Sequence, residues 1–142
     1  MRGLSNTRAT GTFFGAGLLD RFHNLRFPVL ESGFGWTPFR VTHVGDQAHY
    51  MGFMAEGLQH IRSEYTTGGR FFSSIALHEV GRRVKRVSDY LSDYLLMFNL
   101  DYPHAESRFP GSADLALRWT EVDPDLMRKF LGDNAVKALG EP

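Results

Sequence analysis

The sequence predicts an α/β fold with about three short parallel strands, because apolar strand-like runs alternate along it with helix-like patterns. Residues 94–102 begin with a nearly unbroken apolar run, which is typical of a strand buried on both faces of a parallel sheet. Two shorter apolar runs, at 26–30 and 71–75, predict the other strands. The expected order is helix, strand, helix, strand, helix, strand, helix, helix, in a single domain over residues 1–142.

The amino-terminal segment is expected to form a helix followed by the first strand. Residues 1–10 show no periodicity, so we expect them to be frayed. Apolar residues fall at helical spacing over 10–22, although three glycines weaken that helix. The strand at 26–30 follows, and Pro28 is awkward in it because proline cannot donate to a sheet.

The middle of the chain is expected to hold two helices separated by a turn-rich segment and the second strand. Thr37 and Pro38 predict a helix start, as the cap and the first helical residue, and this helix should run through the forties. Residues 56–69 are polar and indicate turns. An amphipathic pattern, with valines on one face and basic residues on the other, predicts a helix over 79–91.

The carboxyl-terminal segment is expected to be helical. Residues 112–119 predict a short helix, and Asp123 followed by Pro124 is a strong start signal for the last one. That last helix should run to residue 139, with an interruption around 132–133.

The composition excludes several classes of function. The chain has 142 residues, with 16 basic and 16 acidic ones, and a net charge of zero argues against electrostatic binding to nucleic acid or a membrane surface. No apolar run approaches the roughly 20 residues of a membrane helix, and the start of the chain lacks a signal-peptide core. We therefore expect a cytoplasmic location. The absence of cysteine excludes disulfides, thiolate metal sites and cysteine nucleophiles, so a metal ion would need His, Asp, Glu or water.

The best candidate site lies where the buried run at 94–102 becomes polar. Asp101 comes at the end of the predicted strand, and His104 and Glu106 lie on the loop beyond it. Chemistry in parallel α/β folds gathers at that end of the sheet. A carboxylate there can ligate a metal ion or accept a proton from a metal-bound water. The alternative is a buried aspartate that caps its own Tyr-Pro turn.

Two further groups are weaker candidates. Glu31 has the same placement at the end of another strand, and the alternative is a carboxylate satisfied by the amides of the glycine-rich loop that follows. His43, Asp46 and His49 are spaced by three, so they can share one helix face as a two-histidine metal site. The alternative is an ordinary surface helix that carries these residues without a ligand.

Several segments, in the right order along nearly the whole chain, resemble the carboxyl-terminal part of the amidohydrolase-related family. Asp101-Tyr102-Pro103-His104 is similar to the end of a motif on the family's last barrel strand, and Asn134-Ala135 resembles a pair in its final helices. The similar segments are 19–22, 30–38, 62–65, 70–72, 97–104, 109–112 and 129–135.

This resemblance implies a metal-dependent (β/α)8 TIM barrel of which the chain supplies only the last three strands with their helices, an incomplete barrel. Family members hydrolyse amides, esters or lactones, or decarboxylate acids without oxidation. The resemblance makes Asp101 a ligand of a divalent metal, zinc or alternatively manganese, or the residue that activates its water. His104 would shape the site, and Glu31 would end the sixth strand. A small-molecule substrate and a homo-oligomeric parent protein are also implied.

The chain is shorter than the about 250 residues of such a barrel, so we expect a fragment: a truncated gene, a partial sequence or half of a split protein. Asp101 alone cannot hold a catalytic zinc, which takes three protein ligands. The isolated chain is therefore expected to be inactive. We also expect it to be poorly stable, because three parallel strands leave two open edges and an uncovered barrel-facing surface. A hydrolase is the first hypothesis. The alternatives are a non-oxidative decarboxylase, a non-catalytic remnant for binding or oligomerisation, and an independent small binding domain.

Overall fold

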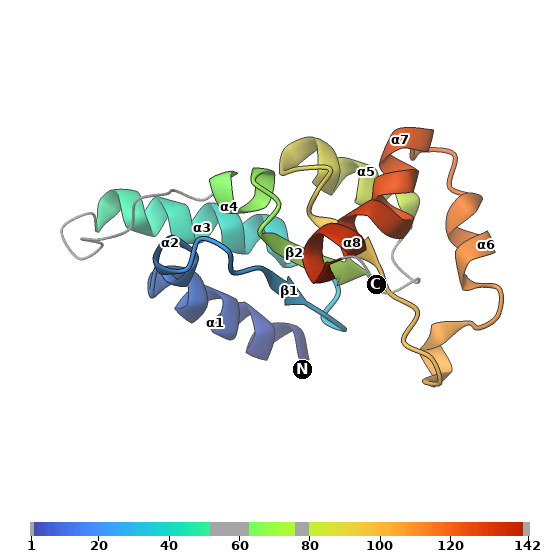
Figure 1. The fold of residues 1–142 in the computed structure, drawn as a ribbon, viewed down its shortest axis with the longest axis horizontal. Coiled ribbons are helices and arrows are strands. Elements are labelled where there is room, and N and C mark those ends of the chain that lie inside the picture. The colour runs from blue at the N-terminus through green and yellow to red at the C-terminus, as the bar shows by residue number, and fades with distance from the viewer. Residues whose placement is uncertain (1, 52–62, 76–79, 141–142) are drawn as a thin grey trace.

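The computed structural model describes residues 2–51, 63–75 and 80–140, and it shows three parallel strands in one open sheet with flanking helices (Figure 1). The strands are β1 (Phe27–Val29), β2 (Phe71–Ile75) and β3 (Leu96–Phe98), in the order β1-β2-β3. Both pairings are parallel, with Ser73 opposite Val29 and Leu96. The predicted α/β class and parallel sheet are therefore confirmed. Pro28 lies in an outer strand of the described sheet, a position that tolerates proline.

The central strand β2 is buried along its whole length and divides the core into two parts. One part contains Phe71 and Ile75 together with Phe14 and Tyr65, whereas the other packs Phe72 against residues of β3 and the last helix. Burial on both faces explains why the strand reads as a continuous run in the sequence.

The first helix, α1 (Arg2–Gly15), begins earlier than expected, so the prediction of a frayed start is wrong. The aromatic end of this helix holds it on the sheet: Phe13 stacks on Phe27 with ring centroids 3.8 Å apart, and Phe14 contacts Phe71 at 5.0 Å. These contacts stabilise the whole helix, including its first residues. Packing against α3 (Thr37–Tyr50), which lies beside α1 (Figure 1), stabilises it further.

The predicted single helix over 10–22 is divided in two by Gly17. This glycine has a φ of 61°, which an L side chain rarely adopts, and it separates α1 from α2 (Leu18–Arg21). The break turns the chain so that Leu19 and Asp20 become buried.

Helix α3 begins where expected, but its cap differs from the prediction. Trp36 is the cap residue and makes no side-chain cap bond, while Thr37 lies inside the helix. The buried Thr37 hydroxyl has no hydrogen-bond partner in the part of the chain that the structure describes. The turn-rich segment also contains a short helix that was not predicted, α4 (Ser63–Thr67).

Helix α5 (Gly81–Tyr90) confirms the amphipathic pattern, since Val84 and Val87 are buried. Residue 79, where this helix was expected to start, lies outside the described residues. After β3 come a 3-10 turn, η2 (Ala105–Ser107), and α6 (Ser112–Leu117).

The last helical segment begins at the predicted residue and is interrupted near the predicted position. Helix α7 (Pro124–Arg128) is capped by Asp123, whose carboxylate accepts the Leu126 amide at 2.9 Å. A π-helical turn, η3 (Lys129–Asp133), follows, and α8 (Asn134–Leu139) ends at glycine. Buried Asn134 donates from its Nδ2 to the carbonyl oxygens of Leu96, the first residue of β3, and of Asp93, three residues before it, both at 2.8 Å. These bonds fix α8 against the amino end of β3.

The longest described helices, α1 and α3, have 14 residues each. Within the described ranges, no helix combines the length and the apolar character that crossing a bilayer requires.

Candidate active site

The three predicted site residues Glu31, Asp101 and His104 lie together at the carboxyl end of the sheet. Their ligand atoms are all within 4.8 Å of one another. Glu31 follows β1 and the other two follow β3, so two loops from the outer strands of the described sheet meet across the end of β2. The sheet topology thus brings together side chains that are 70 positions apart in the sequence.

The loop after β1 holds Glu31 in an unusual backbone conformation. Its φ is 55°, in the left-handed region, which costs a non-glycine residue about 1–2 kcal/mol. The Glu31 amide donates to the Ser74 hydroxyl of β2 at 3.0 Å, and Ser32 donates to the Leu30 carbonyl at 2.9 Å. The left-handed turn redirects the chain directly after the strand, at the residue that joins the cluster.

The loop after β3 places Asp101 by a similar device. Its φ is 56°, a region that aspartate enters more readily than most residues. The Asp101 amide donates to the Asn99 side-chain oxygen at 3.2 Å, and the Asn99 amide group donates to Ser74 at 3.5 Å. Ser74 therefore contacts both loops and couples the positions of the two carboxylates. Because β3 ends at Phe98, Asp101 lies three positions past the strand rather than at its last residue.

His104 is oriented by Asp101. Its Nδ1 lies 2.8 Å from Asp101 Oδ2, and its backbone amide donates to the Asp101 carbonyl at 2.9 Å. The backbone bond closes the turn, so the carboxylate can interact with the imidazole instead of capping that turn. The Asp101 side chain is 17% exposed and that of His104 is 55% exposed. With a proton on Nδ1, the ring keeps the lone pair of Nε2 available.

The donor set suits a divalent cation. Two carboxylates and one imidazole are ligands that zinc and manganese accept. Ligands on a tetrahedral ion with bonds of about 2.1 Å are about 3.4 Å apart, so atoms that lie within 4.8 Å of one another would move closer together on binding one ion. Among the residues that the structure describes, this is the group in which three His, Asp or Glu ligand atoms converge. The sequence had predicted one metal ligand, Asp101, and the structure offers three.

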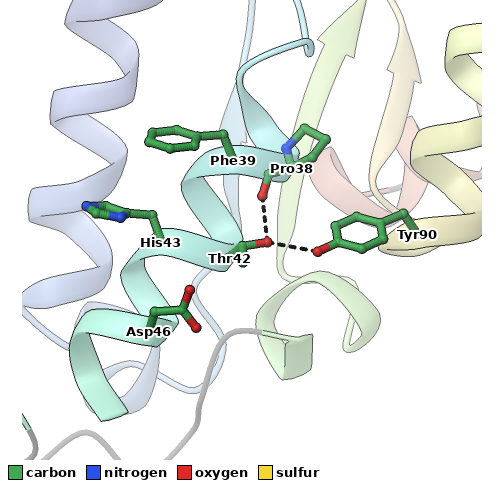
Figure 2. A pocket seen from close by; sticks show the side chains of 6 residues that line it. All are labelled: Pro38, Phe39, Thr42, His43, Asp46 and Tyr90. Atoms are coloured by element: carbon green, nitrogen blue, oxygen red, sulfur yellow. Dashed lines mark hydrogen bonds between the residues drawn. The ribbon is translucent and has the colours of Figure 1, made fainter. Parts of the chain in front are cut away.

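The second predicted group, on α3, does not converge in the described structure. His43 stacks on Phe39 with ring centroids 5.3 Å apart, whereas the Asp46 carboxylate points to the other side of the helix (Figure 2). His49 contacts the neighbouring Tyr50 ring instead. His43 and Asp46, but not His49, line a surface pocket of about 390 Å³. Its lining residues are Pro38, Phe39, Thr42, His43, Asp46 and Tyr90.

Other predicted and unpredicted residues complete the description of the site. The side chain of Glu106 lies outside the described residues, and its backbone is part of η2. Ser74 and Asn99 were not predicted. Asn99 left a weak signal, because an asparagine two residues before another often bonds that residue's amide. Ser74 left none, because its role depends on contacts 43 and 25 positions away.

A polar cluster at the carboxyl end of a parallel sheet is typical of α/β enzymes. The chain belongs to the amidohydrolase family, whose family model matches residues 5–140. The predicted resemblance is therefore confirmed. Amidohydrolases typically bind divalent metal ions. No curated protein that was compared with the chain matches it.

Proposed function

We propose that the chain is part of a metal-dependent hydrolase and that Glu31, Asp101 and His104 belong to its active site. The observation that carries this proposal is the convergence of their ligand atoms within 4.8 Å at the carboxyl end of the sheet. Family membership supports the reaction class, since amidohydrolases are hydrolases or decarboxylases. The substrate is then a small molecule with an amide, ester or lactone bond.

Each side chain has a role in this proposal. Asp101 and Glu31 would hold zinc, or alternatively manganese, with one carboxylate oxygen each. A divalent ion held there would supply Lewis-acid activation of a substrate carbonyl and of water. Asp101 Oδ2 fixes the His104 ring through Nδ1. His104 then accepts a proton at Nε2, and its exposed ring can pass that proton to solvent.

We also propose that the three strands are the last part of a (β/α)8 barrel and that further strands complete the site. In the described residues, β1 and β3 each pair only with β2, which leaves one edge of each strand open. These open edges favour an incomplete barrel, because a closed barrel has no strand edges. The isolated chain is therefore predicted to be inactive.

The proposal is tested by complementation. The chain is assayed alone and after co-expression with the amino-terminal half of an amidohydrolase barrel, on ester, lactone and aromatic acid substrates, with Zn²⁺ or Mn²⁺. We expect metal-dependent hydrolysis only in the complemented protein and its loss with Asp101→Asn. Release of CO₂ without hydrolysis would indicate the decarboxylase alternative.

The matched control is Asp114→Asn, which removes an exposed carboxylate from α6. It should leave turnover unchanged. Turnover by the isolated chain would contradict the need for further strands. Turnover that survives Asp101→Asn would contradict the assigned site, and a complemented, folded protein without any turnover would favour the non-catalytic alternative.

A further inference from the structure

A pocket lined by basic residues lies at the amino end of the sheet, opposite to the end that holds Glu31 and Asp101. Its volume is about 310 Å³. Arg26 directly precedes β1 and Arg70 directly precedes β2, so the pocket lies at the amino ends of these strands. Among the lining residues that the structure describes, three are arginine or lysine and none is a carboxylate. They are His23, Asn24, Arg26, Gly68, Gly69, Arg70 and Lys137. This concentration of positive charge is hidden in a chain whose net charge is zero.

Arg70 is held in place before any ligand binds. Its Nη1 donates to the Leu19 carbonyl at 2.5 Å, and its guanidinium carbon lies 5.6 Å from the Tyr65 ring centroid. A guanidinium has five N–H donors in a rigid fork, so the bond to Leu19 leaves other donors for a ligand. The side chain is half-buried, and a fixed arginine loses little freedom when it binds an anion.

Lys137 reaches the pocket from α8 because residue 69 has no side chain. Gly69 has a φ of 64°, and a Cβ built there would lie 2.3 Å from the Lys137 ammonium nitrogen. The same nitrogen lies 4.1 Å from the Tyr94 ring centroid. The glycine turn and the aromatic ring thus position the ammonium group beside the two arginines.

Two carboxylates in the vicinity of Tyr65 are outside the described pocket lining. Asp20 and Glu64 act electrostatically on Tyr65, as Arg70 does, but neither lines the pocket. Asp20 accepts the Tyr65 hydroxyl at 2.6 Å. Together with burial, this carboxylate raises the pKa of Tyr65, so the hydroxyl stays protonated and the pair stays a hydrogen bond. Asp20 is thus engaged by Tyr65, and the described lining carries basic side chains without a carboxylate.

We propose that this pocket binds a phosphate group, either as inorganic phosphate or as a small phosphate monoester. Arginine and lysine donors from three separate segments match a tetrahedral oxyanion with several acceptor oxygens. The volume lies at the lower end of the about 300–1,000 Å³ typical of small-molecule sites, which fits a phosphate with a short substituent.

The test is isothermal titration of the full chain with inorganic phosphate and, separately, with glycerol 2-phosphate at constant ionic strength. We expect saturable binding that weakens about tenfold in the double variant Arg26→Gln/Lys137→Gln, which removes two charge-assisted contacts. The matched control is Arg83→Gln/Arg86→Gln on α5, which removes the same charge from exposed positions outside the pocket. Its affinity should equal that of the unaltered chain.

Lys137→Arg keeps the positive charge and should retain binding. Circular dichroism of every variant checks that the fold is kept. The single variant Arg26→Gln, at an exposed position, serves if the double variant does not fold. Tighter binding of the ester would identify a phosphorylated small molecule, and binding of inorganic phosphate alone would identify the free ion. Absent saturation, or equal weakening in the control, overturns the proposal. None of the pocket residues belongs to the site of Glu31, Asp101 and His104. A failure of the proposed metal site would therefore leave the phosphate proposal untouched.

Discussion

The two ends of the sheet are built in different ways. At the carboxyl end, two loops place Glu31 and Asp101 in left-handed conformations, with their side chains gathered beside His104. At the amino end, aromatic packing and the buried bonds of Asn134 hold the helices on the strands. The comparison indicates that the carboxyl end retains backbone strain where side chains must converge, whereas the amino end supplies stability.

The largest expected effect is at the amino end, with Phe71→Ala. Phe71 is fully buried and contacts Phe14 with ring centroids 5.0 Å apart. Its truncation leaves a cavity and should lower the free energy of unfolding by about 3–5 kcal/mol, measured by urea denaturation. The control, Phe39→Ala, removes a ring that is 66% exposed and should have little effect. Equal losses for the two variants would contradict the assigned core.

Asn134→Ala should have the next largest effect. The substitution removes both donors to the Asp93 and Leu96 carbonyls and leaves those acceptors without that partner. We expect a loss of about 2 kcal/mol in the same urea experiment. Asn24→Ala, at an exposed position, is the matched control. A loss no greater than that of the control would mean that α8 is not fixed through this side chain.

The pH dependence of stability should include a contribution from Asp93. The Ser88 hydroxyl, followed by Lys129, lowers the pKa of this carboxyl below its ordinary value. A group whose pKa is lower in the folded state stabilises above its unfolded pKa, and this stabilisation is lost as the pH falls through the folded pKa. Asp93→Asn should therefore flatten the loss of stability below about pH 4, by less than about 1 kcal/mol because the site is solvent-screened. An unchanged acid profile would contradict this assignment.

The smallest expected effect is a gain at the carboxyl end. Glu31→Gly relieves the left-handed strain at φ 55°. The greater conformational entropy of glycine in the unfolded chain offsets part of this gain, so the net stabilisation should be about 0.5 kcal/mol. Glu31→Gln removes the charge but keeps the strain, so it should not stabilise through the backbone. Thermal unfolding of both variants separates the effect of the lost charge from the effect of the relieved backbone strain. A loss of stability with glycine would show that the loop is not strained.

Much of this arrangement was predictable because it depends on local signals. The buried run before Asp101 predicted β3, and the Asp123-Pro124 start signal predicted α7. The general placement of chemistry at strand ends directed attention to Glu31 and Asp101, which do follow β1 and β3. The start of α1 was missed because its contacts with the sheet come from Phe13 and Phe14, at its far end. The cap at Thr37 was wrong because the helix begins after Trp36 without a side-chain cap bond.

The remaining features are tertiary and left no pattern to find. Ser74 contacts both site loops only because β2 lies between β1 and β3. The basic pocket joins Arg26, Arg70 and Lys137 from three distant segments, and their charge is cancelled in the overall composition.

The most direct test of the central claim is a Zn²⁺ titration of the chain by calorimetry. If Glu31 and Asp101 hold one metal ion, one equivalent should bind, and Glu31→Gln and Asp101→Asn should each weaken it at least about tenfold. His104→Ala should weaken it to a similar extent, because the imidazole fixes the Asp101 carboxylate. The control, His49→Ala, removes an exposed histidine from α3 and should leave the affinity unchanged. Binding that is unaffected by the three site variants, or weakened equally by the control, would contradict the claim.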